Sequence, residues 1–120
     1  MRDNNLLGRW GEALAAAYLR GKGFAIAAAN YRSRYGEIDL IAQNEAYVVF
    51  AEVKLRASVR FAEAREFVDA RKQERIRGTA LLWLSQHESE RQPRFDVIEI
   101  YAPDGVNTKK PRLIHLENAF

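Results

Sequence analysis

The fold is decided by two neighbouring stretches, Glu37-Ile-Asp-Leu-Ile-Ala42 and Tyr47-Val-Val-Phe-Ala-Glu-Val-Lys54. Each stretch is rich in the β-branched and aromatic residues that strands favour. The polar segment Gln43-Asn-Glu45 lies between them. Two strand-like runs around a short polar turn predict a β-hairpin.

The turn sets which residues of the two strands face each other. A turn centred after Glu45 places Asp39 opposite Glu52 and Glu37 opposite Lys54. Because side chains alternate along a strand, three acids and a lysine are expected on one face. The residues expected on the other face are Ile38, Leu40, Ala51 and Val53.

Asp39 and Glu52 carry the chemistry of this patch, because two facing carboxylates repel unless a cation lies between them. Mg²⁺ or Mn²⁺ takes oxygen ligands and needs only one or two carboxylates beside waters and a phosphate oxygen. The carbonyl oxygen of Val53 could be a further ligand of the ion. Lys54 is placed to orient or deprotonate an attacking water. We therefore expect a metal-dependent site with Asp39, Glu52 and Lys54 as its catalytic residues.

The remaining segments complete an α/β pattern. The first, from Asn4 to about Lys22, is expected to be a helix because apolar residues recur at steps of three and four, at Leu7, Trp10, Leu14, Ala17 and Tyr18. The elements expected further along are a strand over Phe24–Tyr31, a helix capped by Asp69 and ending near Gln86, and strands over Arg94–Ile100 and Arg112–Leu116.

This order, α-β-β-β-α-β-β, predicts one α/β domain over residues 1–120, with a central mixed β-sheet flanked by helices. Within the second helix, Lys72 lies one turn before Ile76 on the apolar stripe, together with Ala80 and Leu84. Its side chain is therefore expected to start on the side that faces the sheet.

Composition narrows the function classes. There are 19 Lys and Arg against 16 Asp and Glu, a net charge of +3, which is compatible with a polyanionic partner. The chain has no cysteine, so thiol catalysis, disulfides and thiolate zinc sites are excluded. No stretch resembles a signal peptide or a membrane span, and the cytoplasm is the expected location.

The acids and the lysine resemble the motif of the PD-(D/E)xK nuclease superfamily, whose first acid stands on one strand and whose E-x-K stands on the next. Here these residues are Asp39, with Ile38 in place of the motif's proline, and Glu52-Val-Lys54. The whole chain is similar to the YraN-like family of small bacterial proteins. The segments that carry this similarity are Gly8–Glu12, Asn30–Arg32, Gly36–Ile41, Phe50–Arg56, Lys72–Ile76 and Arg94–Val97.

The resemblance implies a restriction-endonuclease-like fold and an endonuclease related to Holliday junction resolvases. It implies that Glu12 of the first helix joins Asp39, Glu52 and Lys54 in the site. Lys72 or Gln73 would contact phosphate, and Arg56 and Arg75 complete the expected nucleic-acid contacts. A homodimer would supply the paired sites that branched DNA requires, and the sequence leaves this open.

Other interpretations of the same residues stay open. Asp39, Glu52 and Lys54 would also suit a cross-strand salt-bridge ladder on a solvated sheet face. The leading hypothesis is a metal-dependent endonuclease that cuts structured DNA with a metal-activated water. The alternatives are a nucleic-acid-binding module with weak or no catalysis, and a protein-interaction domain on the same fold.

Overall fold

The computed structural model describes residues 2–57 and 68–120. In chain order its elements are α1 (Arg2–Gly21), β1 (Ala25–Arg32), β2 (Glu37–Gln43), β3 (Tyr47–Arg56), α3 (Ala70–Gln86), β4 (Gln92–Tyr101), the 3-10 turn η1 (Gly105–Asn107) and β5 (Arg112–Leu116). The predicted α/β order is confirmed, and most predicted boundaries lie within two residues of those observed.

The strands form one five-stranded mixed sheet in the order β1-β2-β3-β4-β5. The pairs β1/β2, β2/β3 and β4/β5 are antiparallel, whereas β3 and β4 are parallel. A parallel pair needs a crossover connection, and α3 lies in the segment that joins these two strands. The arrangement is compatible with a restriction-endonuclease-like fold.

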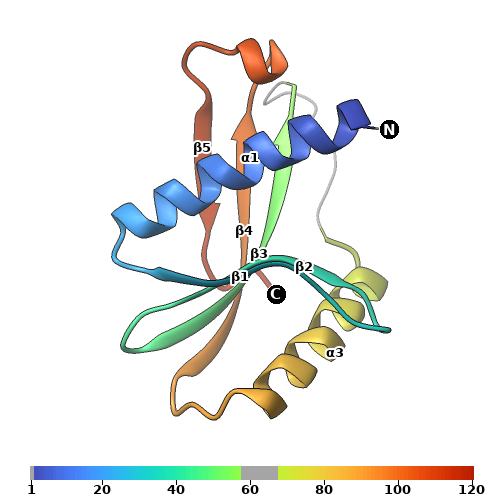
Figure 1. Ribbon diagram of the computed structural model, residues 1–120, viewed down its shortest axis with the longest axis vertical. Coiled ribbons are helices and arrows are strands. Elements are labelled where there is room, and N and C mark those ends of the chain that lie inside the picture. Colours follow the sequence, from blue (N-terminus) through green and yellow to red (C-terminus); the bar gives the residue numbers. More distant parts are fainter. Residues whose placement is uncertain (1, 58–67) are drawn as a thin grey trace.

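One helix covers each face of the sheet (Figure 1). Ala15, Ala16 and Leu19 of α1 pack on one face, together with Leu40 of β2. Ile76, Ala80 and Trp83 of α3 pack on the other face. The result is a three-layer α/β/α arrangement that holds its apolar residues in two cores.

Local signals at the helices agree with the sequence, with one exception. Asp69 caps α3, because its carboxylate accepts the backbone N–H of Lys72 at 2.9 Å. Ala17, predicted on the inner stripe of α1, is exposed, while Ala15 and Ala16 take the buried positions. No helix among the described residues is long and apolar enough to cross a membrane.

The predicted hairpin register is confirmed in the part of the hairpin that pairs. Leu40 lies opposite Ala51, and the next three residues of β2 continue this register to Val48. The observed ladder between β2 and β3 ends at Leu40 and Ala51. Neither predicted pair beyond that point, Asp39 with Glu52 or Glu37 with Lys54, is part of it.

The predicted alternation of faces also fails at one point. Ile38 belongs to the core under α3, while Leu40, two residues later, belongs to the core under α1. Asn30 of β1, across from this point, has a φ of 53°, which a strand residue does not adopt. The sheet is therefore irregular beside Asp39, and β2 turns its faces over there.

A buried polar network fastens α1 to the far edge of the sheet. Asp96 of β4 is 0% exposed and accepts two hydrogen bonds from the guanidinium of Arg94, at 3.0 and 2.8 Å. Its Oδ2 also lies 2.7 Å from Nε2 of His115, whose Nδ1 lies 3.0 Å from the hydroxyl of Tyr18. Because a carboxylate only accepts, Nε2 of His115 donates to Asp96; in the neutral imidazole with its hydrogen on Nε2, Nδ1 accepts from Tyr18.

Candidate active site

The candidate site lies where β2 leaves β3. Beyond Leu40 and Ala51 the two strands no longer pair, and the side chain of Asp39 bridges the opening. Its Oδ2 accepts the backbone N–H of Val53 at 2.8 Å. In a strand the N–H and C=O of one residue point to the same side, so we expect the Val53 carbonyl to face this opening too.

Negative charge is concentrated around Asp39. Burial, and next the charge of Glu52, raise the pKa of Asp39 from 3.8 to about 7. The hydrogen bond from Val53 opposes this rise, and the charges of Glu12 and Glu37 add to it. Glu52 is itself buried, with 7% of its surface exposed. A cation next to Asp39 would offset the repulsion from the neighbouring carboxylates that raises its pKa.

The pKa values of Lys72 and Lys54, two lysines near Glu52, are shifted in opposite directions. Nζ of Lys72 lies 2.7 Å from Oε2 of Glu52, so this lysine of α3 does face the sheet, as predicted. Burial opposes its charge, but the hydrogen bond and charge of Glu52 outweigh that effect and raise the pKa of Lys72. Burial, followed by the nearby charge of Lys72, lowers the pKa of Lys54. Neighbouring groups whose pKa values are pushed apart are suited to different roles.

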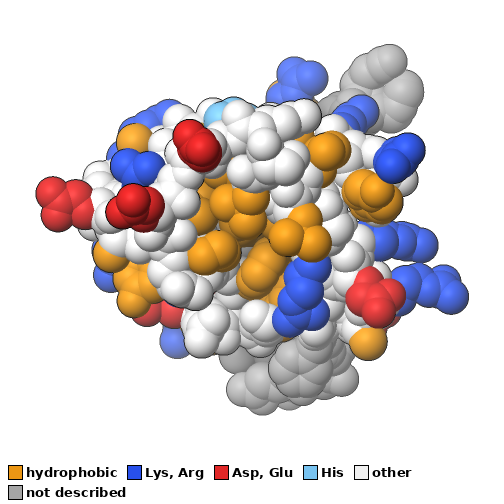
Figure 2. Space-filling view, turned by 90° about the horizontal axis from the view of Figure 1, so that it is seen from below, with side chains coloured by type: hydrophobic (Ala, Val, Ile, Leu, Met, Phe, Trp, Pro, Cys, Tyr) orange, Lys and Arg blue, Asp and Glu red, His pale blue; other side chains and the backbone are white. Residues whose placement is uncertain are grey.

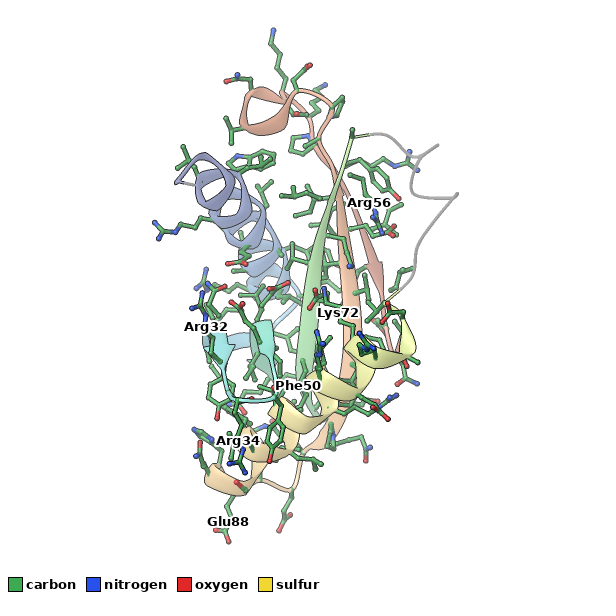
Figure 3. All side chains as sticks on the ribbon, turned by 90° about the vertical axis from the view of Figure 1, so that its right-hand side faces the viewer. Arg32, Arg34, Phe50, Arg56, Lys72 and Glu88 are labelled. Carbon is green, nitrogen blue, oxygen red and sulfur yellow. The ribbon has the colours of Figure 1, made fainter. Side chains whose placement is uncertain are left out.

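Two open clefts meet at Asp39. The first, of about 470 Å³, lies on the α1 side and is lined by Arg9, Glu12, Asn30 and Arg32 among others. The second, of about 330 Å³, lies on the α3 side and is lined by Glu52, Lys72 and Arg75 among others. Glu37 and Asp39 line both. Figure 3 shows Lys72 reaching from α3 toward β3, with Arg32 and Arg34 on the β1–β2 hairpin.

Glu12 is held at the first cleft by the irregularity of β1. Its Oε1 accepts a hydrogen bond of 3.0 Å from the amide of Asn30. Asparagine tolerates the left-handed backbone that this residue adopts better than most residue types. The same distortion therefore turns β2 at Asp39 and orients Glu12.

Carboxylate and carbonyl oxygens are the kinds of ligand that a magnesium or manganese ion prefers. Among residues 2–57 and 68–120, no three Asp, Glu or His side chains lie close enough together to surround a cation. The set at hand is two carboxylates, Asp39 and Glu52, and the expected carbonyl of Val53. Magnesium accepts such a set because it retains several waters. The positive charge of Lys72 at Glu52 is what an entering cation would have to compete with.

The four predicted nucleic-acid contacts are placed differently. Lys72 and Arg75 line the α3-side cleft. The side-chain amide of Gln73 donates to the backbone carbonyl of Val68 at 2.8 Å. This hydrogen bond holds the amide at the start of α3. The Arg56 side chain is 10% exposed and lies 3.5 Å from Glu99. Phosphate contacts by Gln73 and Arg56 therefore stay predictions. Lys72 and Arg75 are better placed to reach a phosphate in the α3-side cleft.

The family of the chain follows from comparison with known proteins. A family model described as uncharacterised protein family UPF0102 matches residues 11–100. This chain belongs to UPF0102. The matched region contains the candidate-site residues of this chain from Glu12 to Arg75. The resemblance found in the sequence is therefore confirmed at the level of the family.

Other UPF0102 proteins match over nearly their full length. One from Syntrophomonas wolfei is 42% identical over 123 residues, which span 98% of this chain and 99% of the relative. One from Nocardia farcinica is 42% identical over 119 residues, with 98% and 91% covered. One from Rhodococcus opacus is 43% identical over 123 residues, with both chains covered in full. These names give a family and no activity, so the chemistry rests on the site.

Several residues of the UPF0102 site were missed in the sequence. Arg9 and Arg32 line the α1-side cleft, and Asn30 positions Glu12. An asparagine inside a predicted strand was a usable signal, because strands are depleted of asparagine. Arg9 and Arg32 lie in segments that carry the family similarity, but nothing local marked them as site residues, because a single arginine in a helix or strand is most often solvated.

Mn²⁺ is expected to stabilise this UPF0102 protein, because the ion would relieve the repulsion between Asp39 and Glu52. At a concentration about a hundredfold above its Kd, the ion should raise the Tm by about 10 °C, and EDTA should reverse the effect. Differential scanning fluorimetry measures the shift.

Glu52→Gln should lose most of this shift, while Glu45→Gln, in the exposed β2–β3 turn, should retain it. An equal shift in both variants would place the ion elsewhere on the surface.

Proposed function

We propose that this protein is a Mg²⁺- or Mn²⁺-dependent endodeoxyribonuclease that hydrolyses phosphodiester bonds in structured or branched DNA. The observation that carries the proposal is the half-buried Asp39 beside the buried Glu52, at the point where β2 leaves β3 and next to two lysines of opposite pKa shift. Buried acids whose charges oppose each other suggest a function, because they cost stability when no cation is bound.

Each residue has a role that its place supports. Asp39, Glu52 and the Val53 carbonyl would hold the ion, with Glu12 contributing from the α1 side. When bound, the ion would supply the positive charge that makes a water more acidic and balances the charge of the phosphate. Lys72 would keep Glu52 oriented through their ion pair.

Lys54 is the proposed proton acceptor. Its lowered pKa brings the neutral amine closer to the working pH, so Nζ would take a proton from the attacking water. The water oxygen would bond to phosphorus as the bond from phosphorus to the leaving sugar oxygen breaks, and that oxygen would take a proton from solvent. Arg75, on the wall of the same cleft, would hold the phosphate.

Basic residues on both sides of Asp39 support DNA as the substrate. Arg9 and Arg32 line one cleft, and Lys72 and Arg75 line the other. A strand that crosses Asp39 would meet positive charge before and after the scissile phosphate. We propose a cytoplasmic location for this activity, and a homodimer where both strands of a branch are cut.

A nucleic-acid-binding module without efficient catalysis is the second candidate. The observation that favours it is the 2.7 Å ion pair between Lys72 and Glu52, which neutralises one of the two acids without a metal. Under this candidate the protein would bind DNA with a strong dependence on salt and would cut nothing.

The test is cleavage of labelled single-stranded, duplex, flap and four-way-junction DNA with Mn²⁺ or with EDTA. The wild type is expected to cut at least one substrate in Mn²⁺ and none in EDTA, and Glu52→Ala is expected to cut none. Circular dichroism of both proteins verifies folding. A folded wild type that binds these DNAs and cuts none would replace the nuclease by the binding module.

A further inference from the structure

The turn between β1 and β2 is fastened to α3. The backbone N–H of Ser33 donates to the carbonyl of Gly36 at 2.8 Å, and the N–H of Gly36 donates to the carbonyl of Ser33 at 3.3 Å. The hydroxyl of Ser33 lies 2.8 Å from that of Thr79, a residue of α3 that is 0% exposed. A side chain at Gly36 would approach Cβ of Arg75 to 3.2 Å, so the turn sits close against the helix. The turn is therefore held in one position relative to the site.

This turn presents an aromatic ring to solvent. Tyr35 is 45% exposed, and it is the one aromatic residue among the large apolar side chains that are exposed in the described part of the chain. One side of it lies on Gly78 of α3, where an added Cβ would be 3.3 Å from Cγ of the ring. Arg34 donates to the Tyr35 hydroxyl at 3.1 Å, and its guanidinium lies 5.2 Å from the ring centroid.

Positive charge surrounds the ring. Tyr35 lines a shallow cleft of about 280 Å³ with Arg71, Arg75 and the acid Glu74. Figure 2 shows Lys and Arg side chains projecting from the right-hand edge of the molecule, the side on which the β1–β2 turn, one end of α3 and the start of α1 lie in Figure 1. An exposed ring among arginines is the combination that binds unpaired nucleotides, with a base on the ring and phosphates on the guanidinium groups.

The ring is connected to the candidate active site. Arg75 lines both the cleft of Tyr35 and the cleft that contains Asp39 and Glu52. Asp39 lies four positions after Tyr35 along the chain, so their Cα atoms are at most about 14 Å apart. A base on Tyr35 would thus belong to a nucleotide within a few positions of a phosphate at Asp39.

We infer that Tyr35 is a stacking platform for an unpaired base, so that the site takes DNA whose strand is single next to the scissile phosphate. The inference rests on the proposed function for what happens at Asp39, but the stacking itself requires no cleavage. Bases inside a duplex stack on neighbours at both faces and leave none for Tyr35. Single strands, flaps and opened junctions do expose a base face, which narrows the substrate class.

The test measures binding in EDTA, where nothing can be cut, by fluorescence anisotropy with two oligonucleotides of about eight units. One is oligo-dT, and the other has the same sugar-phosphate chain without bases. The wild type is expected to bind oligo-dT about tenfold more tightly. Tyr35→Leu, which keeps an apolar side chain on Gly78, should lose this preference while still binding the abasic chain. Tyr35→Phe should keep it.

Leu116→Ala serves as the matched control, because Leu116 is similarly exposed on β5, at the opposite edge of the sheet. It should bind both oligonucleotides as the wild type does. A preference for oligo-dT that survives in Tyr35→Leu, or a wild type without any preference, would overturn the inference. Tighter binding of oligo-rU than of oligo-dT would overturn the assignment to DNA.

The same proteins separate this inference from the proposed function. Cleavage of duplex DNA in Mn²⁺ that needs Glu52 but is unaffected by Tyr35→Leu would leave the nuclease in place and remove the stacking platform. A Tyr35-dependent preference for bases without cleavage of any DNA would support the platform and remove the nuclease.

Discussion

Asp39→Asn should reduce cleavage by about a thousandfold or more and should stabilise the metal-free protein. Asparagine keeps the size of the side chain and an oxygen that can accept the Val53 N–H, which lies 2.8 Å from Oδ2 in the wild type. It cannot supply the negative charge that a cation needs. Rates on the DNA that the wild type cuts, measured in Mn²⁺, test the first half of this prediction.

The stabilisation expected from Asp39→Asn should increase as the pH rises. Burial and the charge of Glu52 raise the pKa of Asp39 from 3.8 to about 7. A carboxyl with a raised folded pKa binds its proton more tightly in the folded state, so its ionisation destabilises the fold as the pH rises from about 4 to about 7. Asp39→Asn removes this loss. Urea unfolding in EDTA should therefore show a stabilised variant near pH 8 and a smaller difference near pH 5.

Glu45→Gln, at the exposed turn, is the control for both halves and should change neither. A folded Asp39→Asn protein that cuts at the wild-type rate would remove Asp39 from the catalytic residues. A variant that is less stable than the wild type near pH 8 would mean that the carboxylate stabilises the metal-free fold.

Asp96→Asn should lower the free energy of unfolding by about 3 to 5 kcal/mol, the range found when a buried ion pair loses one partner. The change leaves the half-buried guanidinium of Arg94 beside Glu117, whose oxygen is 3.9 Å away, as its remaining acid. It also removes the charged acceptor of His115, which links β5 to α1 through Tyr18. Urea unfolding near pH 7 measures the loss.

The same carboxylate predicts how the protein responds to acid. Burial disfavours the charge of Asp96, but the hydrogen bonds from His115, Arg94 and the backbone of Asn118 outweigh this effect and lower its pKa. A lowered folded pKa adds stability above the ordinary carboxyl range, near pH 4, and that stability is lost as the pH falls further. The wild type should therefore lose stability below about pH 4 more steeply than Asp96→Asn.

Asp104→Asn is the matched control, because Asp104 is exposed in the segment after β4. Its unfolding should follow that of the wild type at every pH. If Asp96→Asn were as stable as the wild type near pH 7, the network would contribute no net stability to the fold.

The sequence by itself determined the elements and much of the site. The order of strands and helices, the register from Leu40 with Ala51, and the Asp69 cap were predicted and observed. So was the inward position of Lys72, now seen at Glu52. These features depend on periodicity, turn length and capping, which act over a few residues and can be read locally.

Only the tertiary structure decided what lies around Asp39. The end of the β2–β3 ladder, the change of faces between Ile38 and Leu40, and the contact of Asn30 with Glu12 all depend on how three elements meet. The position of Tyr35 on Gly78 likewise joins residues from different parts of the chain. A period of two assumes an unbroken strand, so it cannot show where a strand bends to open a site. The sequence predicted the residues of the candidate site, whereas the packing of the elements produces the opening between β2 and β3.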